Sequence, residues 1–157
     1  MHPNVELIDR FYTAFNAHDG DAMGACYTDD VDFNDAVFVG LKGEHARNMW
    51  RMLCERGKDL KLEHSRVVAD DNSGSAHWEA RYTFSTTGRL VHNIIDAKFT
   101  FRDGKIATHT DSFDFWRWSR QALGGAGLVL GWSPMLRNKV RATAAAGLAA
   151  FEAKRAR

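Results

Sequence analysis

The feature that most constrains the fold is a change in the period of the apolar residues near Leu60. Before this position, apolar residues recur every three to four positions, as they do on one face of an amphipathic helix. After it, apolar and polar residues alternate through 60–70, 75–86, 89–104 and 105–118, the period of half-buried β-strands. Helices followed by an antiparallel meander predict the α+β class, with a curved sheet packed on N-terminal helices.

Three helices and one short strand are expected before the meander. Residues 3–17 carry a single apolar stripe, residues 21–27 form a short second helix, and residues 44–56 form a third. Between the second and third helices, Val31 and Phe33 alternate with polar residues and predict a strand. The turns "DDNSG", "TTG" and "RDGK" between the later strands are typical of hairpin connections.

An extra amphipathic helix is expected at the C-terminus. Ser133 and Pro134 suit the N-cap and the first turn. Its narrow apolar stripe consists of Leu136, Val140, Ala144, Leu148 and Phe151. The glycine-rich stretch 124–131 is expected to bend without binding phosphate, because it does not follow a strand. We expect residues 1–118 to form one domain and residues 119–157 to be a helical extension that packs on it or meets a second subunit.

Composition narrows the possible partners and compartment. A net charge of +1 on 157 residues gives no reason to expect nucleic acid, and the basic C-terminal residues are interpreted as a solvated helix face. Cys26 and Cys54 lie within helical patterns and are interpreted as core residues in a reducing compartment. The N-terminus lacks the pattern of a signal peptide, and the longest apolar stretch is too short to span a bilayer. We therefore expect a cytoplasmic protein without a membrane partner.

The stretch "KIATHTDSFDFWRW", residues 105–118, combines an aromatic face with two titratable groups. As a strand, it places on one face the side chains of Ala107, His109, Asp111, Phe113 and Phe115. The aromatic side chains indicate that this face is buried, so the histidine and the aspartate are expected to be buried with them.

The order of elements and two segments together resemble the nuclear transport factor 2-like superfamily. These segments are "FYTAFNAHDGDAMGACYTDDVDF" and "KFTFRDGKI", and the resemblance extends over residues 4–116. The superfamily includes ketosteroid isomerases, SnoaL-like polyketide cyclases and limonene epoxide hydrolases. The resemblance implies a cone-shaped antiparallel or mixed sheet that encloses an apolar pocket, and a homodimer paired through the sheet. It implies a small apolar ligand and no cofactor.

The catalytic residues of ketosteroid isomerases carry over only in part. The resemblance places their proton-shuttling aspartate at Asp35, after "DDVDFN". Their oxyanion-hole tyrosine falls on Phe11, which has no hydroxyl, and their protonated aspartate falls on Ala97. Asp96 takes that place only if a β-bulge shifts the strand, because ideal alternation puts it on the opposite face. We therefore do not expect a plain steroid isomerase.

The last strand supplies other acid and base groups. The resemblance places His109, Asp111 and Phe113 on pocket-lining positions, and Asp111 resembles the acid/base aspartate of SnoaL-like cyclases. The usual histidine partner of that aspartate corresponds to Ala97, so His109 is expected to replace it. Burial of a carboxyl group in an apolar cavity raises its pKa. With Asp35, these groups are expected to remove a carbon-bound proton and to deliver one elsewhere.

Other side chains are expected to contact the ligand. They are Phe11, Tyr12, Phe38, Trp50, Trp78, Tyr82, Asn93 and Phe113. Most of the aromatic ones equally fit a role in core packing. Trp116, Trp118 and Trp132 flank the glycine bend and are expected to close the pocket mouth or an interface.

Structural roles remain open for the three candidate catalytic residues. Asp35 fits a residue that caps a turn, and His109 with Asp111 fits a buried polar pair that never touches a substrate. The H-x-D spacing also fits two metal ligands, but no third ligand is evident, so no metal is expected. Epoxide hydrolysis would call for an arginine on the inner face, where none is expected because Arg66 and Arg81 fall on the outer face.

The sequence thus predicts a small, cofactor-free SnoaL-like or isomerase-like enzyme. It would transfer protons by acid/base chemistry on an apolar carbonyl compound. The alternative is a noncatalytic domain that binds an apolar ligand or serves in dimerisation.

Overall fold

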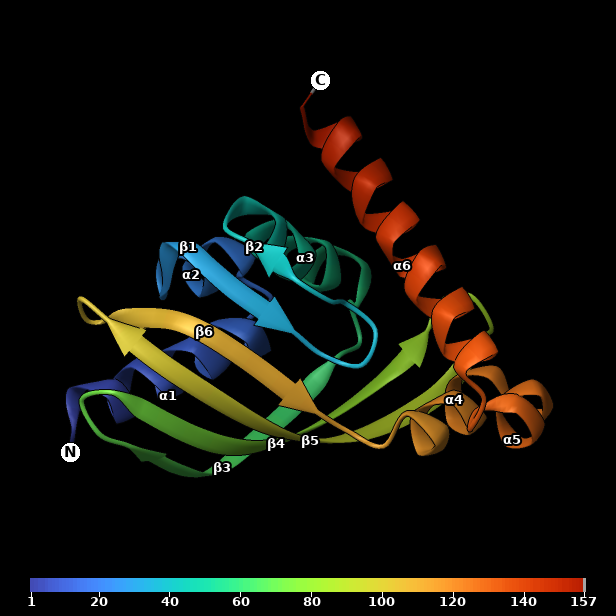
Figure 1. Ribbon diagram of the computed structural model, residues 1–157, viewed down its shortest axis with the longest axis horizontal. Coiled ribbons are helices and arrows are strands. Elements are labelled where there is room, and N and C mark those ends of the chain that lie inside the picture. The colour runs from blue at the N-terminus through green and yellow to red at the C-terminus, as the bar shows by residue number, and fades with distance from the viewer. Residues whose placement is uncertain (157) are drawn as a thin grey trace.

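The computed structural model describes residues 1–156 and consists of a curved sheet with helices packed on one of its faces (Figure 1). The first helices are α1 (Pro3–Asn16), α2 (Gly20–Ala25) and α3 (Glu44–Arg56). The prediction of three N-terminal helices is confirmed, and α3 has the predicted bounds. The second helix ends earlier than predicted, because Tyr27 already belongs to the first strand.

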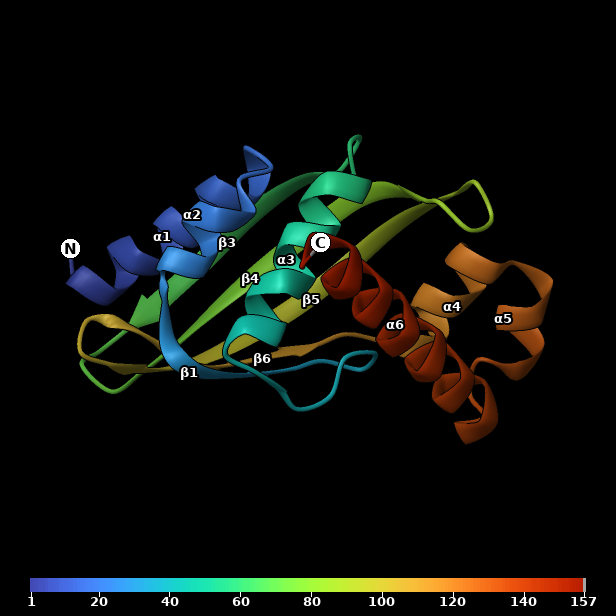
Figure 2. The same cartoon turned by 90° about the horizontal axis from the view of Figure 1, so that it is seen from above.

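Six strands form one open, mixed sheet. They are β1 (Tyr27–Asn34), β2 (Leu41–Lys42), β3 (Lys61–Ala69), β4 (Ser73–Phe84), β5 (Arg89–Arg102) and β6 (Lys105–Ser112). The spatial order is β2-β1-β6-β5-β4-β3. The antiparallel meander β3 to β6 is confirmed, and β1 pairs in parallel with β6. The expected α+β architecture, a mixed sheet packed with helices, is therefore present (Figure 2).

Strand alternation determines which side chains face the helices. On β5, Ala97 is buried and pairs with Asp111, whereas Asp96 points outward and hydrogen-bonds His77 at 2.9 Å. No bulge intervenes at this point of β5, so Asp96 does not reach the inner face. Arg66 and Arg81 are exposed, as predicted.

The prediction that the last strand continues to residue 118 is wrong. The strand ends at Ser112, and Asp114 caps a new helix, α4 (Phe115–Leu123), by accepting a hydrogen bond from the backbone N–H of Arg117. Phe115 therefore lies on a helix rather than on the strand face. It is still buried, in a small cluster with Val91, Trp118 and Ala122.

The glycine-rich stretch is also more regular than predicted, because it contains α5 (Gly125–Leu130). Its glycines allow α5 to pack directly on α4. A Cβ atom on Gly127 would lie 2.0 Å from the backbone oxygen of Ser119, and one on Gly131 would lie 2.2 Å from the Ser119 Oγ. Glycine is required at both positions by this close approach.

The final helix, α6 (Pro134–Arg155), begins as predicted. The Ser133 Oγ accepts a hydrogen bond from the backbone N–H of Leu136. The helix lies against α3, with Leu148 as its buried contact (Figure 2). Glu152 accepts hydrogen bonds from His45 and Asn48. Within residues 1–156, no helix has the length and apolar character needed to cross a bilayer.

Two alanine substitutions test the packing of α5 on α4. Gly127→Ala should lower the free energy of unfolding by about 1–3 kcal/mol, because its methyl group overlaps the Ser119 carbonyl. Gly125→Ala, the matched control in the same helix, meets no atom within 4 Å and should change stability by less than about 1 kcal/mol. Urea unfolding measures both, and equal effects would contradict this packing.

Candidate functional site

A chain of hydrogen-bonded polar groups runs through the apolar interior. His109 is completely buried and Asp111 is 5% exposed, both on the inner face of β6 as predicted. The His109 Nε2 lies 2.9 Å from the Asp111 Oδ1, and the His109 Nδ1 lies 2.8 Å from the Tyr27 hydroxyl. Trp50 donates its indole N–H to that hydroxyl at 2.8 Å, and Trp78 donates to the Asp111 Oδ1 at 3.3 Å. The chain links β1, α3, β4 and β6.

The donors in this chain favour one tautomer of His109. The indole of Trp50 can only donate, so the Tyr27 oxygen accepts that bond and its own proton is left to donate to the His109 Nδ1. The proton of the imidazole then resides on Nε2 and is donated to the Asp111 carboxylate. In this arrangement each hydrogen bond between Trp50, Tyr27, His109 and Asp111 has one donor and one acceptor.

Aromatic rings enclose the imidazole on several sides. The ring centroids of Phe99, Phe33 and Phe11 lie 4.5, 5.0 and 5.5 Å from that of His109. Trp50 stacks on it at 6.0 Å. Water is therefore excluded, and electrostatic interactions inside this region are stronger than they would be at the surface.

Tyr12 brings a second hydroxyl near Asp111. The side chain is completely buried, and its hydroxyl has no hydrogen-bond partner within residues 1–156. Burial raises the pKa of Tyr12 well above its usual value, and the negative charge of Asp111 raises it further. The phenol is thus an uncommitted proton donor close to a carboxylate.

Asp35 lies directly after β1 and holds the following loop. Its carboxylate accepts hydrogen bonds from the backbone N–H groups of Val37 at 2.7 Å and Phe38 at 2.6 Å. Burial raises the pKa of Asp35 to about 7, and the charge of Asp111 adds to the rise, while the two N–H donors and Arg141 oppose it. The residue makes no hydrogen bond to the His109–Asp111 pair, so the interaction between the two carboxyl groups is electrostatic.

The side chains predicted to contact a ligand fall into two groups. Five are almost completely buried and fill the interior: Phe11, Tyr12, Trp50, Trp78 and Asn93. The other three, Phe38, Tyr82 and Phe113, are partly exposed and lie at the end of the sheet against which α4 packs. Tyr82 accepts a hydrogen bond from the indole of Trp118 at 2.8 Å, and burial raises its pKa to about 12.

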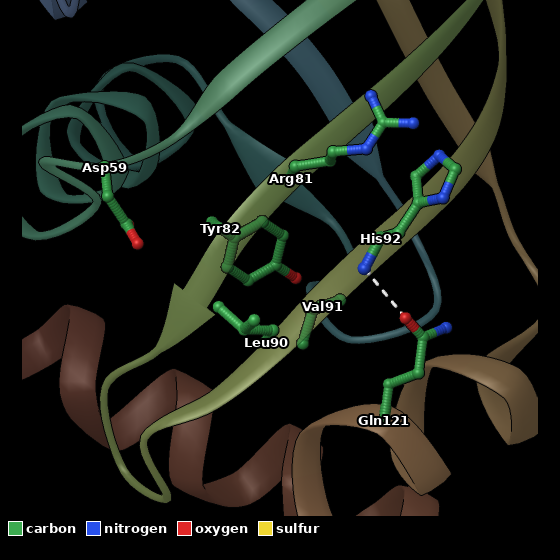
Figure 3. A pocket seen from close by; sticks show the side chains of 7 residues that line it. All are labelled: Asp59, Arg81, Tyr82, Leu90, Val91, His92 and Gln121. Atoms are coloured by element: carbon green, nitrogen blue, oxygen red, sulfur yellow. Dashed lines mark hydrogen bonds between the residues drawn. The ribbon is translucent and has the colours of Figure 1, made fainter.

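Two surface pockets open near this end of the sheet. One, of about 370 Å³, is lined by Tyr82 and Val91 together with Gln121, which accepts a hydrogen bond from the backbone N–H of His92 (Figure 3). The other, of about 300 Å³, lies between α6 and the loop that contains Phe38. Neither pocket is lined by the three predicted catalytic residues. His109 and Asp111 are buried among packed side chains, whereas Asp35 is only partly buried. Residues 1–156 contain no cluster of three His, Cys, Asp or Glu side chains suited to a metal.

Comparisons with known proteins identify the family. The family model of the SnoaL-like domain matches residues 8–109, which is more than half of the chain. The chain belongs to the SnoaL-like family. A comparison with curated proteins found no match.

Solved structures similar to this SnoaL-like protein share its fold. An LEH-like epoxide hydrolase from M. tuberculosis is 21% identical with a TM-score of 0.63, over 81% of this chain and 92% of that one. A putative polyketide cyclase from Xanthomonas campestris pv. campestris is 23% identical with a TM-score of 0.62, over 76% and 96%. An NTF2-like protein of unknown function from Burkholderia pseudomallei K96243 is 18% identical with a TM-score of 0.67, over 78% and 98%.

Two residues of the site were missed by the sequence analysis. Tyr27 was assigned to the end of a helix, and the bulge between Tyr27 and Asp32 interrupts the alternation that would otherwise link it to Val31 and Phe33. Arg141 lies on α6, where its Nε donates to the backbone oxygen of Ala36 beside Asp35. No local pattern signals a contact between residues so distant in the sequence.

Two buried tyrosines provide a matched test of the polar chain. Tyr27→Phe should lower the free energy of unfolding by about 1–3 kcal/mol, because it leaves the Trp50 N–H and the His109 Nδ1 without partners. Tyr12→Phe removes a hydroxyl that has no partner and should be neutral or slightly stabilising. Denaturant unfolding compares the two, and equal losses would contradict the assigned network.

The pKa of Asp35 predicts a pH dependence of stability. Because folding raises this pKa from 3.8 to about 7, the folded state binds the proton more tightly than the unfolded state. The stabilisation of the folded state by protonated Asp35 is complete below about pH 3.8 and is lost as the pH rises through about 7. In Asp35→Asn the amide oxygen still accepts the two N–H bonds, but no proton is bound or released. The free energy of unfolding of the wild-type protein should therefore fall by about 2–4 kcal/mol relative to this variant as the pH rises through the window. Parallel curves of unfolding free energy against pH would exclude the raised pKa.

Proposed function

We propose that this SnoaL-like protein is a small, cofactor-free enzyme that moves a proton on an apolar carbonyl compound. The observation that carries the proposal is the asymmetric engagement of the Asp111 carboxylate. Its Oδ1 accepts bonds from both His109 and Trp78, whereas its Oδ2 has no hydrogen-bond donor within residues 1–156. One oxygen fixes the carboxylate in place and the other is free to accept a proton.

The proposed reaction begins at the carbon next to a carbonyl group. The Asp111 Oδ2 takes a proton from this carbon, and the electron pair of the broken C–H bond forms an enolate. The Tyr12 hydroxyl donates a hydrogen bond to the enolate oxygen, and Asp35, half protonated near pH 7, supplies a second donor. Where a C=C bond is conjugated with the enolate, Asp111 returns the proton to the far carbon of the dienolate and an isomer results. Where a second carbonyl lies in the same molecule, the enolate carbon attacks its carbon, the C=O π electrons move to oxygen, and that alkoxide takes the proton back from Asp111 to give a ring.

His109 acts in this proposal by positioning Asp111. Its imidazole is held between the Tyr27 hydroxyl and the carboxylate, so the Oδ1 cannot rotate away from its two donors. The aromatic enclosure supports the same role, because the low dielectric strengthens the hydrogen bond that holds the base. Tyr27 and Trp50 act in the same way, because their hydrogen bonds hold the imidazole of His109 in place.

Substrate access requires movement at the α4 end of the sheet. The interior is filled by aromatic side chains, while Phe38, Tyr82 and Phe113 are partly exposed where the chain leaves β1, β4 and β6. Displacement of these side chains would admit a small, apolar molecule and would exclude charged ones. We expect the reaction to occur in the cytoplasm, where the buried Cys26 and Cys54 stay reduced.

Deuterium exchange tests the proposal directly. Cyclic ketones incubated with the protein in heavy water should exchange their α-protons faster than in buffer, as followed by proton NMR. Asp111→Asn should lower the exchange rate about a hundredfold or more, because the base is removed. Asp96→Asn changes a carboxylate on the outer face of the neighbouring strand and should leave the rate unchanged. Equal rates for the two variants would overturn the proposed role of Asp111.

The second candidate is a noncatalytic domain, and the packed interior favours it. Both nitrogens of His109 are engaged and neither pocket reaches Asp111, which is the arrangement of a satisfied structural pair. Such a domain would bind an apolar ligand near Tyr82, or would dimerise through the outer face of the sheet. Saturable binding of ketones without any exchange, in the wild-type protein, would favour this candidate over the enzyme.

A further inference from the structure

An apolar knob projects from the molecule at α5, at the turn that follows it and at the first turn of α6. The knob consists of Leu128, Val129, Leu130, Trp132 and Met135, whose exposures range from 40% to 73%. Such side chains are normally buried, and here they lie together within eight residues. α5 packs on α4 at the end of the molecule opposite the N-terminus (Figures 1 and 2).

The backbone of the knob is fixed although its side chains are exposed. The indole of Trp116 donates to the backbone oxygen of Leu128 at 3.1 Å, and that of Trp132 donates to Val129 at 2.7 Å. Gly127 and Gly131 hold the segment against Ser119. The apolar side chains are therefore presented on a rigid support.

The segment that carries the knob has charges of one sign. Between Phe115 and Phe151 the sequence contains five basic residues and no Asp or Glu. The five are Arg117, Arg120, Arg137, Lys139 and Arg141, and none of them forms an ion pair within residues 1–156. Residues 1–114 have a net negative charge instead, because they contain 19 acidic and 13 basic side chains. Positive charge is thus concentrated on the part of the chain that carries the knob.

We propose that the knob docks on the surface of an anionic lipid bilayer. Exposed Trp, Leu, Val and Met side chains fit the boundary between headgroups and acyl chains. The exposed side chains of Arg120, Arg137 and Lys139 complement anionic headgroups. The six residues of α5 are far too few to span a bilayer, so the contact is peripheral. The expectation of no membrane partner rested on the absence of a spanning segment, which does not bear on such a contact.

A second copy of the chain is a poorer occupant of the knob. In a symmetric dimer the same patch faces itself, which would bring the two sets of unpaired cations together. Docking of the basic knob on the acidic part of another copy is head-to-tail, so it forms an open chain unless its rotation closes a ring. An anionic bilayer satisfies both the apolar and the charged features without either difficulty.

Vesicle flotation tests the docking surface without any substrate, and so independently of the proposed enzyme. The wild-type protein should float with vesicles of phosphatidylcholine and phosphatidylglycerol at low salt. It should float much less with pure phosphatidylcholine vesicles or at high salt, because the headgroup attraction is then absent or screened. Equal flotation with both kinds of vesicle would overturn the role of charge.

Single substitutions identify the contact. Val129→Ser and Trp132→Ser should each lower the partition coefficient between vesicles and water about tenfold. Each substitution removes one apolar side chain whose burial in the bilayer would favour binding. Val68→Ser, the matched control, removes an equally exposed valine on β3 and should have no effect. Lys139→Gln should weaken binding, whereas Lys98→Gln on the outer face of β5 should not.

Sedimentation velocity separates the lipid contact from self-association. The wild-type protein and Trp132→Ser should have the same oligomeric state in the absence of vesicles. A wild-type oligomer that dissociates in Trp132→Ser, together with no flotation of the wild-type protein, would overturn the proposal and assign the knob to a protein interface.

Discussion

The hydrogen bond between His109 and Asp111 inside an aromatic interior constrains the elements packed around it. A buried imidazole and a buried carboxylate are tolerated only if their polar atoms find partners, because each unsatisfied group costs free energy that packing must offset. The partners come from three other elements: Tyr27 on β1, Trp50 on α3 and Trp78 on β4. The same bonds that satisfy the pair therefore fix where these elements sit relative to β6.

The sequence predicted correctly the parts of the fold that depend on residues close together in the chain, such as the alternation of side chains along a strand. The two-residue period placed His109 and Asp111 on the buried face, and the regular register of β5 at Ala97 left Ala97 inside and Asp96 outside. The end of β6 was missed, because the alternation of "SFDFW" continues past the point at which Asp114 caps α4. Capping by a single carboxylate prevailed there over the apolar period.

Contacts between distant segments were beyond the reach of sequence patterns. The irregular pairing of β1 with β6 concealed Tyr27, since the bulge between Tyr27 and Asp32 leaves two consecutive buried and two consecutive exposed residues. The contact of Arg141 with the loop at Asp35 depends on how α6 crosses the molecule. The candidate acid and base groups were thus predictable one by one, whereas their supports and their packed surroundings were not.

The central place of β6 in the sheet has a consequence for how the chain is made. This strand is the last of the six in the sequence, yet it lies between β1 and β5 and pairs with both. While the ribosome is still adding the meander, β1 has emerged without the partner against which it will finally lie. The sheet around β1 cannot form until β6 has been translated, so apolar side chains of the N-terminal half stay exposed until then. Nascent chains of this topology therefore depend on whatever shields them during that interval.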